Sequence, residues 1–67
     1  MAKWCARKLN SFDINTPEDF EKALKETPRF FFNSLKEVES WCGGKLYKER
    51  CGYSGMYGNS IYVAGRV

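Results

Sequence analysis

The amino-acid sequence predicts a small α+β domain of order β-α-β-α-β-β, with two helices on one face of a mostly antiparallel sheet. Two segments carry helix-capping signals followed by apolar residues at helical spacing. Beyond the glycine pair at 43–44, apolar residues alternate with period two, as they do in strands. A length of 67 residues leaves room for a single domain, residues 1–67.

The N-terminal segment "AKWCARKL", residues 2–9, is the first predicted strand, because apolar and polar residues alternate loosely along it. It carries charges where a secretory signal would have an apolar stretch, so no signal peptide is expected. No apolar run in the chain approaches the length of a membrane span. We therefore expect a cytoplasmic protein that does not contact a membrane.

The segment "NTPEDFEKALKET", residues 15–27, predicts the first helix. Thr16 can cap its N-terminus, Pro17 occupies the first helical position, and Asp19 stands where the acid of a capping box belongs. The apolar face consists of residues three or four apart, namely Phe20, Ala23, Leu24 and Thr27. Pro28 ends the helix, because the residue before a proline avoids the helical region.

The segment "RFFFN", residues 29–33, is predicted to be the second strand, because three consecutive phenylalanines favour β structure. Residues 33–34 also resemble a new helix cap. The alternative is a longer second helix that starts at residues 27–28, since apolar side chains keep helical spacing from there. We expect large rings to fill the small core, in particular Trp4, Phe20, Phe30, Phe32 and Trp41.

The segment "NSLKEVESWCGG", residues 33–44, predicts the second helix. Ser34 is the expected cap and Glu37 completes the capping box. Its apolar face comprises Leu35, Val38, Trp41 and Cys42. The glycine pair that follows supplies a left-handed stop.

Two runs with strand periodicity follow, residues 45–53 and 60–67. Glycines and Asn59 punctuate their connection, so we expect an antiparallel hairpin. The uncharged segment "CGYSGMYGNSIY", residues 51–62, would then span its tip. Tyrosine, serine, glycine and asparagine are the residues enriched in loops that bind proteins.

The net charge of +3 is unevenly distributed. Residues 1–12 carry three bases and no acid, residues 13–42 carry four bases and seven acids, and residues 43–67 carry four bases and one acid. If the two basic ends form neighbouring strands, the molecule has a basic face and an acidic face.

The sequence predicts a protein that is not an enzyme. It contains no histidine, which is the commonest general base near neutral pH, and no nucleophile-elbow, P-loop or HExxH motif. Cys51, beside Arg50, is the best candidate nucleophile, but with no base in reach we expect it to be structural. We therefore expect no cofactor and no small-molecule substrate.

The three cysteines, Cys5, Cys42 and Cys51, are expected to be free and mostly packed. An odd number of cysteines without a signal peptide is typical of a reducing compartment. A zinc site is the alternative, but there is no CxxC pair, and a carboxylate would have to be the fourth ligand. We expect no bound metal.

The predicted function is occupation of a surface on a macromolecular partner, most simply a host protein or protein complex. Tyr53, Met56 and Tyr57 are the expected anchors on the hairpin tip, because large amphipathic side chains dominate binding hot spots. Charge would come from three flanking basic residues, Lys48, Arg50 and Arg66. In so small a domain, the same tyrosines could instead face the core.

The alternative function is binding of single-stranded nucleic acid. The basic ends of the sequence are interleaved with aromatic residues. Exposed rings on a sheet can stack on bases while cations neutralise phosphates.

In its size and its lack of catalytic residues, the chain resembles the short free-standing domains with which phages and other mobile elements block host machinery. Anti-CRISPR and anti-restriction proteins belong to that class. The resemblance implies an inhibitor that occludes a surface of its target, and it assigns no individual residue. DNA mimics of that class are strongly acidic, whereas this chain is basic.

Overall fold

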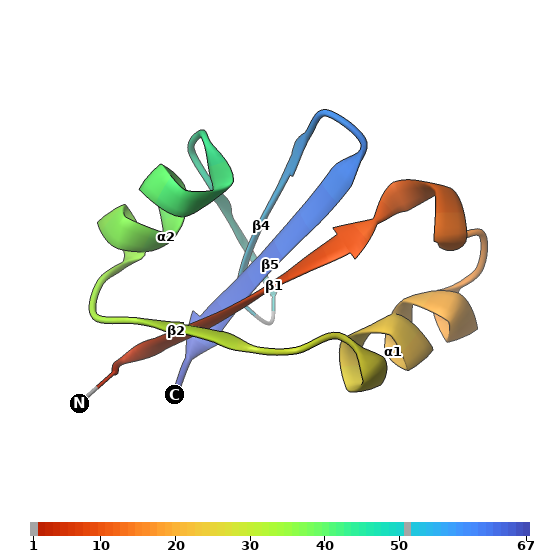
Figure 1. Cartoon of the computed structure of the whole chain (residues 1–67), viewed down its shortest axis with the longest axis horizontal. Coiled ribbons are helices and arrows are strands. Elements are labelled where there is room, and N and C mark those ends of the chain that lie inside the picture. Colours follow the sequence, from red (N-terminus) through yellow and green to blue (C-terminus); the bar gives the residue numbers. More distant parts are fainter. Residues whose placement is uncertain (1, 51) are drawn as a thin grey trace.

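The computed structural model describes residues 2–50 and 52–67 (Figure 1). The elements are β1 (Trp4–Asn10), the 3-10 helix η1 (Ser11–Asp13), α1 (Pro17–Glu26), β2 (Phe30–Phe32), α2 (Leu35–Cys42), β3 (Tyr47–Glu49), β4 (Gly52–Tyr57) and β5 (Ser60–Arg66). This arrangement confirms the predicted α+β class and the order of its elements. It also confirms that residues 30–32 form a strand rather than part of a longer helix.

The five strands form one antiparallel sheet in the order β2-β1-β5-β4-β3. β1 and β5 are its central pair, from Trp4 opposite Arg66 to Asn10 opposite Ser60. β2 and β3, each three residues long, are the two edges. The two basic ends of the sequence are therefore neighbours in space.

Both helices begin at the predicted caps. The Thr16 hydroxyl accepts a hydrogen bond from the Asp19 amide at 3.1 Å, and the Ser34 hydroxyl accepts one from the Glu37 amide at 3.2 Å. The acids in turn accept hydrogen bonds from the amides just before each cap. α2 ends at Gly43, whose φ of 90° is the left-handed conformation that glycine adopts without a Cβ clash.

The segment predicted as a hairpin tip is a strand. Residues 52–57 form β4, which pairs with β3 on one side and with β5 on the other. Gly58, with φ of 62°, opens the β4–β5 turn, as glycine does at the first central position of a type II′ turn. The prediction was wrong because the glycines of this segment permit tight turns and close packing between strands rather than forming a loop.

The two helices cover opposite faces of the sheet. Val38 and Cys42 of α2 form the buried core with Ala6, Leu46 and Ala64. We call this side the α2 face. Its side chains on the central strands come from the even-numbered residues of β1 and β5, because successive strand residues point to opposite sides.

α1 packs on the other side, which we call the α1 face. Phe20 and Leu24 of α1 lie beside Arg7 and Val63, and Ala23 lines a hollow with the buried Leu9. The expectation that both helices share one face is thus corrected. Each face presents apolar side chains from the central strands, so each needs a cover of its own.

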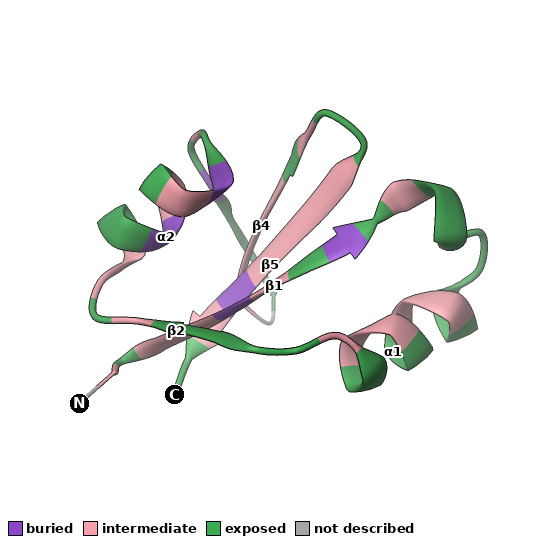
Figure 2. Ribbon diagram, viewed as in Figure 1, coloured by how far each residue is buried: buried purple, intermediate pink, exposed green. Residues whose placement is uncertain are grey.

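The tighter packing lies under α2 (Figure 2). The Trp41 ring is 5.2 Å from that of Phe30, 5.4 Å from that of Phe32 and 5.3 Å from that of Tyr62, measured between centroids. α1 contributes no buried residue, whereas α2 contributes two. The α2 face is therefore the main core, and the α1 face remains partly open.

Candidate functional site

The anchors predicted from sequence do not share one surface. Tyr53 and Tyr57 are half-buried on the α2 face, whereas Met56 is 63% exposed. In a strand, the side chain of residue 56 points to the opposite side of the sheet from residues 53 and 57. The predicted placement of all three on one hairpin tip is therefore wrong, because the segment is extended and paired on both sides.

Tyr53 and Tyr57 help to build the core. The Tyr53 ring meets the Trp4 ring edge-on, at 5.5 Å between centroids. The Tyr57 hydroxyl donates a hydrogen bond to the carbonyl of Lys45, and its ring lies where a Cβ on Gly44 would be. Burial is the main cause that raises the pKa of Tyr57 above 10.0, with smaller contributions from neighbouring groups. These two rings therefore face the core, the alternative that the sequence left open.

The predicted cations are exposed but divided between the two faces. The Arg66 guanidinium lies 5.5 Å from the centre of the Trp4 ring, on the α2 face. Lys48 pairs with Tyr53 and so projects to that face as well. Arg50, in the β3–β4 turn, lines a hollow on the α1 face.

The free edge of β2 is an apolar surface, and it includes Phe30, which the sequence predicted to be a core residue. Phe30 is 44% exposed and Phe31 is 54% exposed. Phe30 pairs with Ala6 and lies on the α2 face, whereas Phe31 pairs with Cys5 and lies on the α1 face. Among the described strands, only β1 pairs with β2. The run of three phenylalanines is the sequence signal for this edge, but edge position depends on strand order.

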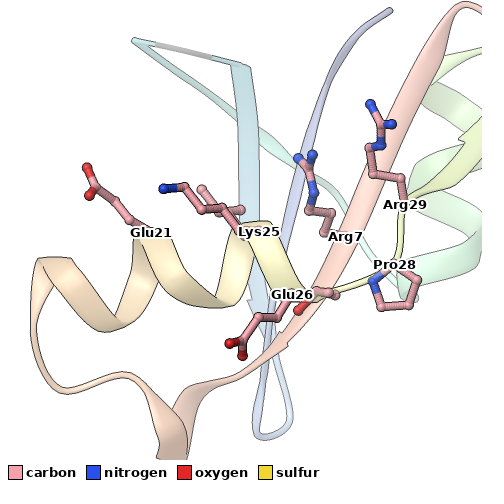
Figure 3. Close-up of a pocket in the computed structure, with 8 residues that line it drawn as sticks. Arg7, Glu21, Lys25, Glu26, Pro28 and Arg29 are labelled. Carbon is pink, nitrogen blue, oxygen red and sulfur yellow. The ribbon is translucent and has the colours of Figure 1, made fainter.

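A hollow of about 780 Å³ opens on the α1 face between α1 and β2 (Figure 3). Its lining residues are Arg7, Glu21, Leu24, Lys25, Glu26, Thr27, Pro28 and Arg29. The guanidinium groups of Arg7 and Arg29 point the same way, and the Glu26 carboxylate points away from them. The Lys25 amine points toward Glu21 rather than toward Arg7. Two arginines therefore lie together without a carboxylate between them.

The positions of these two arginines are set by packing. The Arg29 guanidinium carbon lies 5.7 Å from the centre of the Phe31 ring. The Nε of Arg7 is buried and has no hydrogen-bond partner among the described residues. Neither arginine was singled out as a site residue from sequence, because their proximity depends on the pairing of β1 with β2.

The described residues contain no group of three or more histidine, cysteine, aspartate or glutamate side chains that could hold a metal ion. Cys5 is half-buried and Cys42 is buried, and both are free. The Cys42 thiol donates a hydrogen bond to the Gly44 carbonyl at 3.2 Å, so it is held within the core. Cys51, the candidate nucleophile, lies outside the described residues.

In comparisons with known proteins, no family model matches the chain, and no curated protein or solved structure is significantly similar to it. Within residues 2–50 and 52–67, neither helix has the length and apolar character needed to cross a bilayer.

Proposed function

We propose that this is a non-enzymatic binding protein that occupies a surface of a protein partner through the free edge of β2. The observation that carries the proposal is the pair of exposed rings, Phe30 and Phe31, on the two sides of an edge strand. An exposed apolar edge offers unpaired backbone groups together with apolar contacts, which is how sheet edges accept a strand from another protein.

The packing of the two rings supports this role. The Phe30 ring packs on Trp41, and the Phe31 ring lies under the Arg29 guanidinium, so both are held before any partner arrives. Side chains ordered in advance lose less conformational entropy on binding. Aromatic residues and arginine are also the commonest binding hot spots.

The proposal extends to inhibition. A domain that resembles the small phage and mobile-element inhibitors in size would act by stoichiometric occlusion, with no chemistry of its own. A phage or mobile-element protein of the anti-CRISPR or anti-restriction type would have a component of the host defence machinery as its partner. Loss of that component's activity on addition of one equivalent of this protein is the corresponding functional assay.

The test is a pull-down from bacterial lysate with the tagged protein, its Phe31→Ser variant and a Phe12→Ser control. Phe12 is 70% exposed but lies in η1, away from β2. We expect a stoichiometric protein band that survives nuclease treatment with the wild type and the control, and at least tenfold less of it with Phe31→Ser.

Melting temperatures of the three proteins separate binding from folding. A band that persists with a folded Phe31→Ser variant would show that the edge is not the contact. Loss of the band on nuclease treatment would replace the protein partner with nucleic acid. Concentration-dependent light scattering by the pure protein, abolished by Phe31→Ser, would mean that the edge pairs with a second copy instead.

A further inference from the structure

Three arginines on the α1 face are spread over the width of the sheet. Arg29 precedes β2, Arg7 lies in β1, and Arg50 lies in the β3–β4 turn. β2 and β3 are four strand spacings apart, or about 19 Å. We call Arg29, Arg7 and Arg50 the arginine row.

Two adjoining hollows run along this row. Arg7 and Arg29 line the hollow of about 780 Å³, while Arg7 and Arg50 line a second hollow of about 420 Å³. The hollows share Arg7 and Leu24. The row therefore lies along two shallow hollows that adjoin at Arg7 and Leu24 beside α1.

The charges of the row are largely unopposed around Arg7 and Arg29. Around the first hollow, the Glu26 carboxylate points away and Glu21 lies toward Lys25 (Figure 3). In the second, the Glu49 carboxylate lines the hollow together with Arg50 and accepts a hydrogen bond from the Ser54 hydroxyl at 3.2 Å, so it offsets part of the positive charge there. The buried Nε of Arg7 has no partner among the described residues, and a buried donor left without a hydrogen bond destabilises the fold. An anion in the hollows would relieve both the charge repulsion and this unmade hydrogen bond.

The shape of the two hollows favours an extended anion that carries flat apolar groups. A water molecule takes up about 30 Å³, so each hollow is far larger than a single small ion. The floor of the second hollow includes the small residues Cys5, Gly52 and Gly65, and Phe20 and Leu24 stand beside it. An unstacked base fits such a hollow, whereas the bases of a duplex are paired and stacked.

We propose that the arginine row binds single-stranded nucleic acid, with backbone phosphates on the three guanidinium groups and a base in the hollow between Arg7 and Arg50. Arginine suits this role because its planar guanidinium bonds phosphate oxygens in pairs. Arg29 is common to this site and to the protein contact proposed for β2, because it lies over the Phe31 ring, whereas Arg50 lies at the opposite edge of the sheet and belongs to the row alone.

The experiment is a titration of the full chain into a fluorescein-labelled single-stranded oligothymidine, followed by fluorescence anisotropy between 50 and 200 mM salt. Each phosphate contact to a single strand contributes about −0.7 to the slope of log affinity against log salt. With three phosphate contacts, the affinity should fall about 20-fold between 50 and 200 mM salt, and with two contacts it should fall about sevenfold. Arg50→Ala should therefore show the shallower dependence.

Lys48→Ala is the matched control, because Lys48 carries the same charge two residues away but projects to the α2 face. The affinity of Lys48→Ala should still fall about 20-fold between 50 and 200 mM salt, whereas that of Arg29→Ala should fall about sevenfold, as for Arg50→Ala. Arg50→Ala should still capture any protein partner, which separates this site from the proposed function.

Four results would overturn the proposal. The first is no binding by the folded wild type at 50 mM salt, and the second is an equal effect of Lys48→Ala and Arg50→Ala on the salt dependence of the affinity. The third is equal affinity for a duplex of the same length. The fourth is complete competition by inorganic phosphate at the same phosphate concentration. The last result would mean a site for a free oxyanion.

Discussion

At the scale of single residues, Gly52 occupies the most restricted backbone position in the sheet. Its φ is 147°, a conformation that other residues rarely adopt. A Cβ at this position would overlap the carbonyl oxygen of Ala64 on β5. The start of β4 can therefore lie against β5 only because residue 52 has no side chain.

We expect Gly52→Ala to lower the free energy of unfolding by at least about 2 kcal/mol, since the backbone conformation alone costs about 1–2 kcal/mol and the overlap adds to it. Gly65→Ala is the control, because a Cβ there meets nothing within 4 Å and its φ is ordinary. Urea unfolding measures both. Equal stability of the two variants would contradict this account of how the start of β4 lies against β5.

Tyr57 should give the protein a stability that depends on pH. Burial raises the pKa of its phenol in the folded state above the ordinary 10.0. The unfolded chain therefore loses this proton first, so the contribution of Tyr57 is intact below pH 10 and is lost as pH rises toward the folded pKa. The wild type should lose more stability between pH 9 and pH 11 than Tyr57→Phe does.

Urea midpoints of both proteins at each pH provide the measurement. The remaining tyrosines and the lysines are common to the two proteins, so their effects cancel in the difference. Parallel pH profiles would show that the Tyr57 hydroxyl is as easily ionised in the folded state as in the unfolded chain.

At the scale of elements, the two helices differ in how firmly they are held. α2 contributes Val38 and Cys42 to the core, whereas α1 contributes no buried residue. Helices as short as these are marginal in water and depend on tertiary packing. α1 should therefore open more readily than α2.

Native-state hydrogen exchange tests this difference. The amides of residues 21–26 in α1 should exchange at least tenfold faster than the amide of Cys42 and those of the central pair β1 and β5, because local opening is easier where few apolar contacts are lost. Uniform protection of both helices and the sheet would mean that α1 opens only with the whole molecule.

The elements that the sequence predicted correctly are specified by residues close together in the chain. Each helix cap lies three residues from its hydrogen-bond partner, Thr16 from Asp19 and Ser34 from Glu37, so the helix starts could be predicted. The division between β3 and β4 was not, because Gly52 is constrained by Ala64, a residue of another strand. The face that each helix covers was not predictable either, since it depends on strand order.

At the scale of the whole molecule, the contrast between local sequence signals and long-range strand pairing explains why the candidate sites differ from those predicted. Tyr53, Met56 and Tyr57 have the chemistry of binding residues, but the alternation of β4 sends the two tyrosines into the core. Arg7 and Arg29 are 22 positions apart in sequence and come together only through the pairing of β1 with β2. The residue types indicated a protein that binds through basic and aromatic side chains, whereas the pairing of the strands determines which of these side chains share a surface.

The central position of β5 has a consequence for the order of events during synthesis. A ribosome delivers residues 60–66 after every other strand, yet these residues separate β1 from β4 in the finished sheet. Until they emerge, no strand joins β4 to β1 within the sheet. The sheet can therefore be completed only once β5 has left the exit tunnel, because no earlier strand can take its place between β1 and β4.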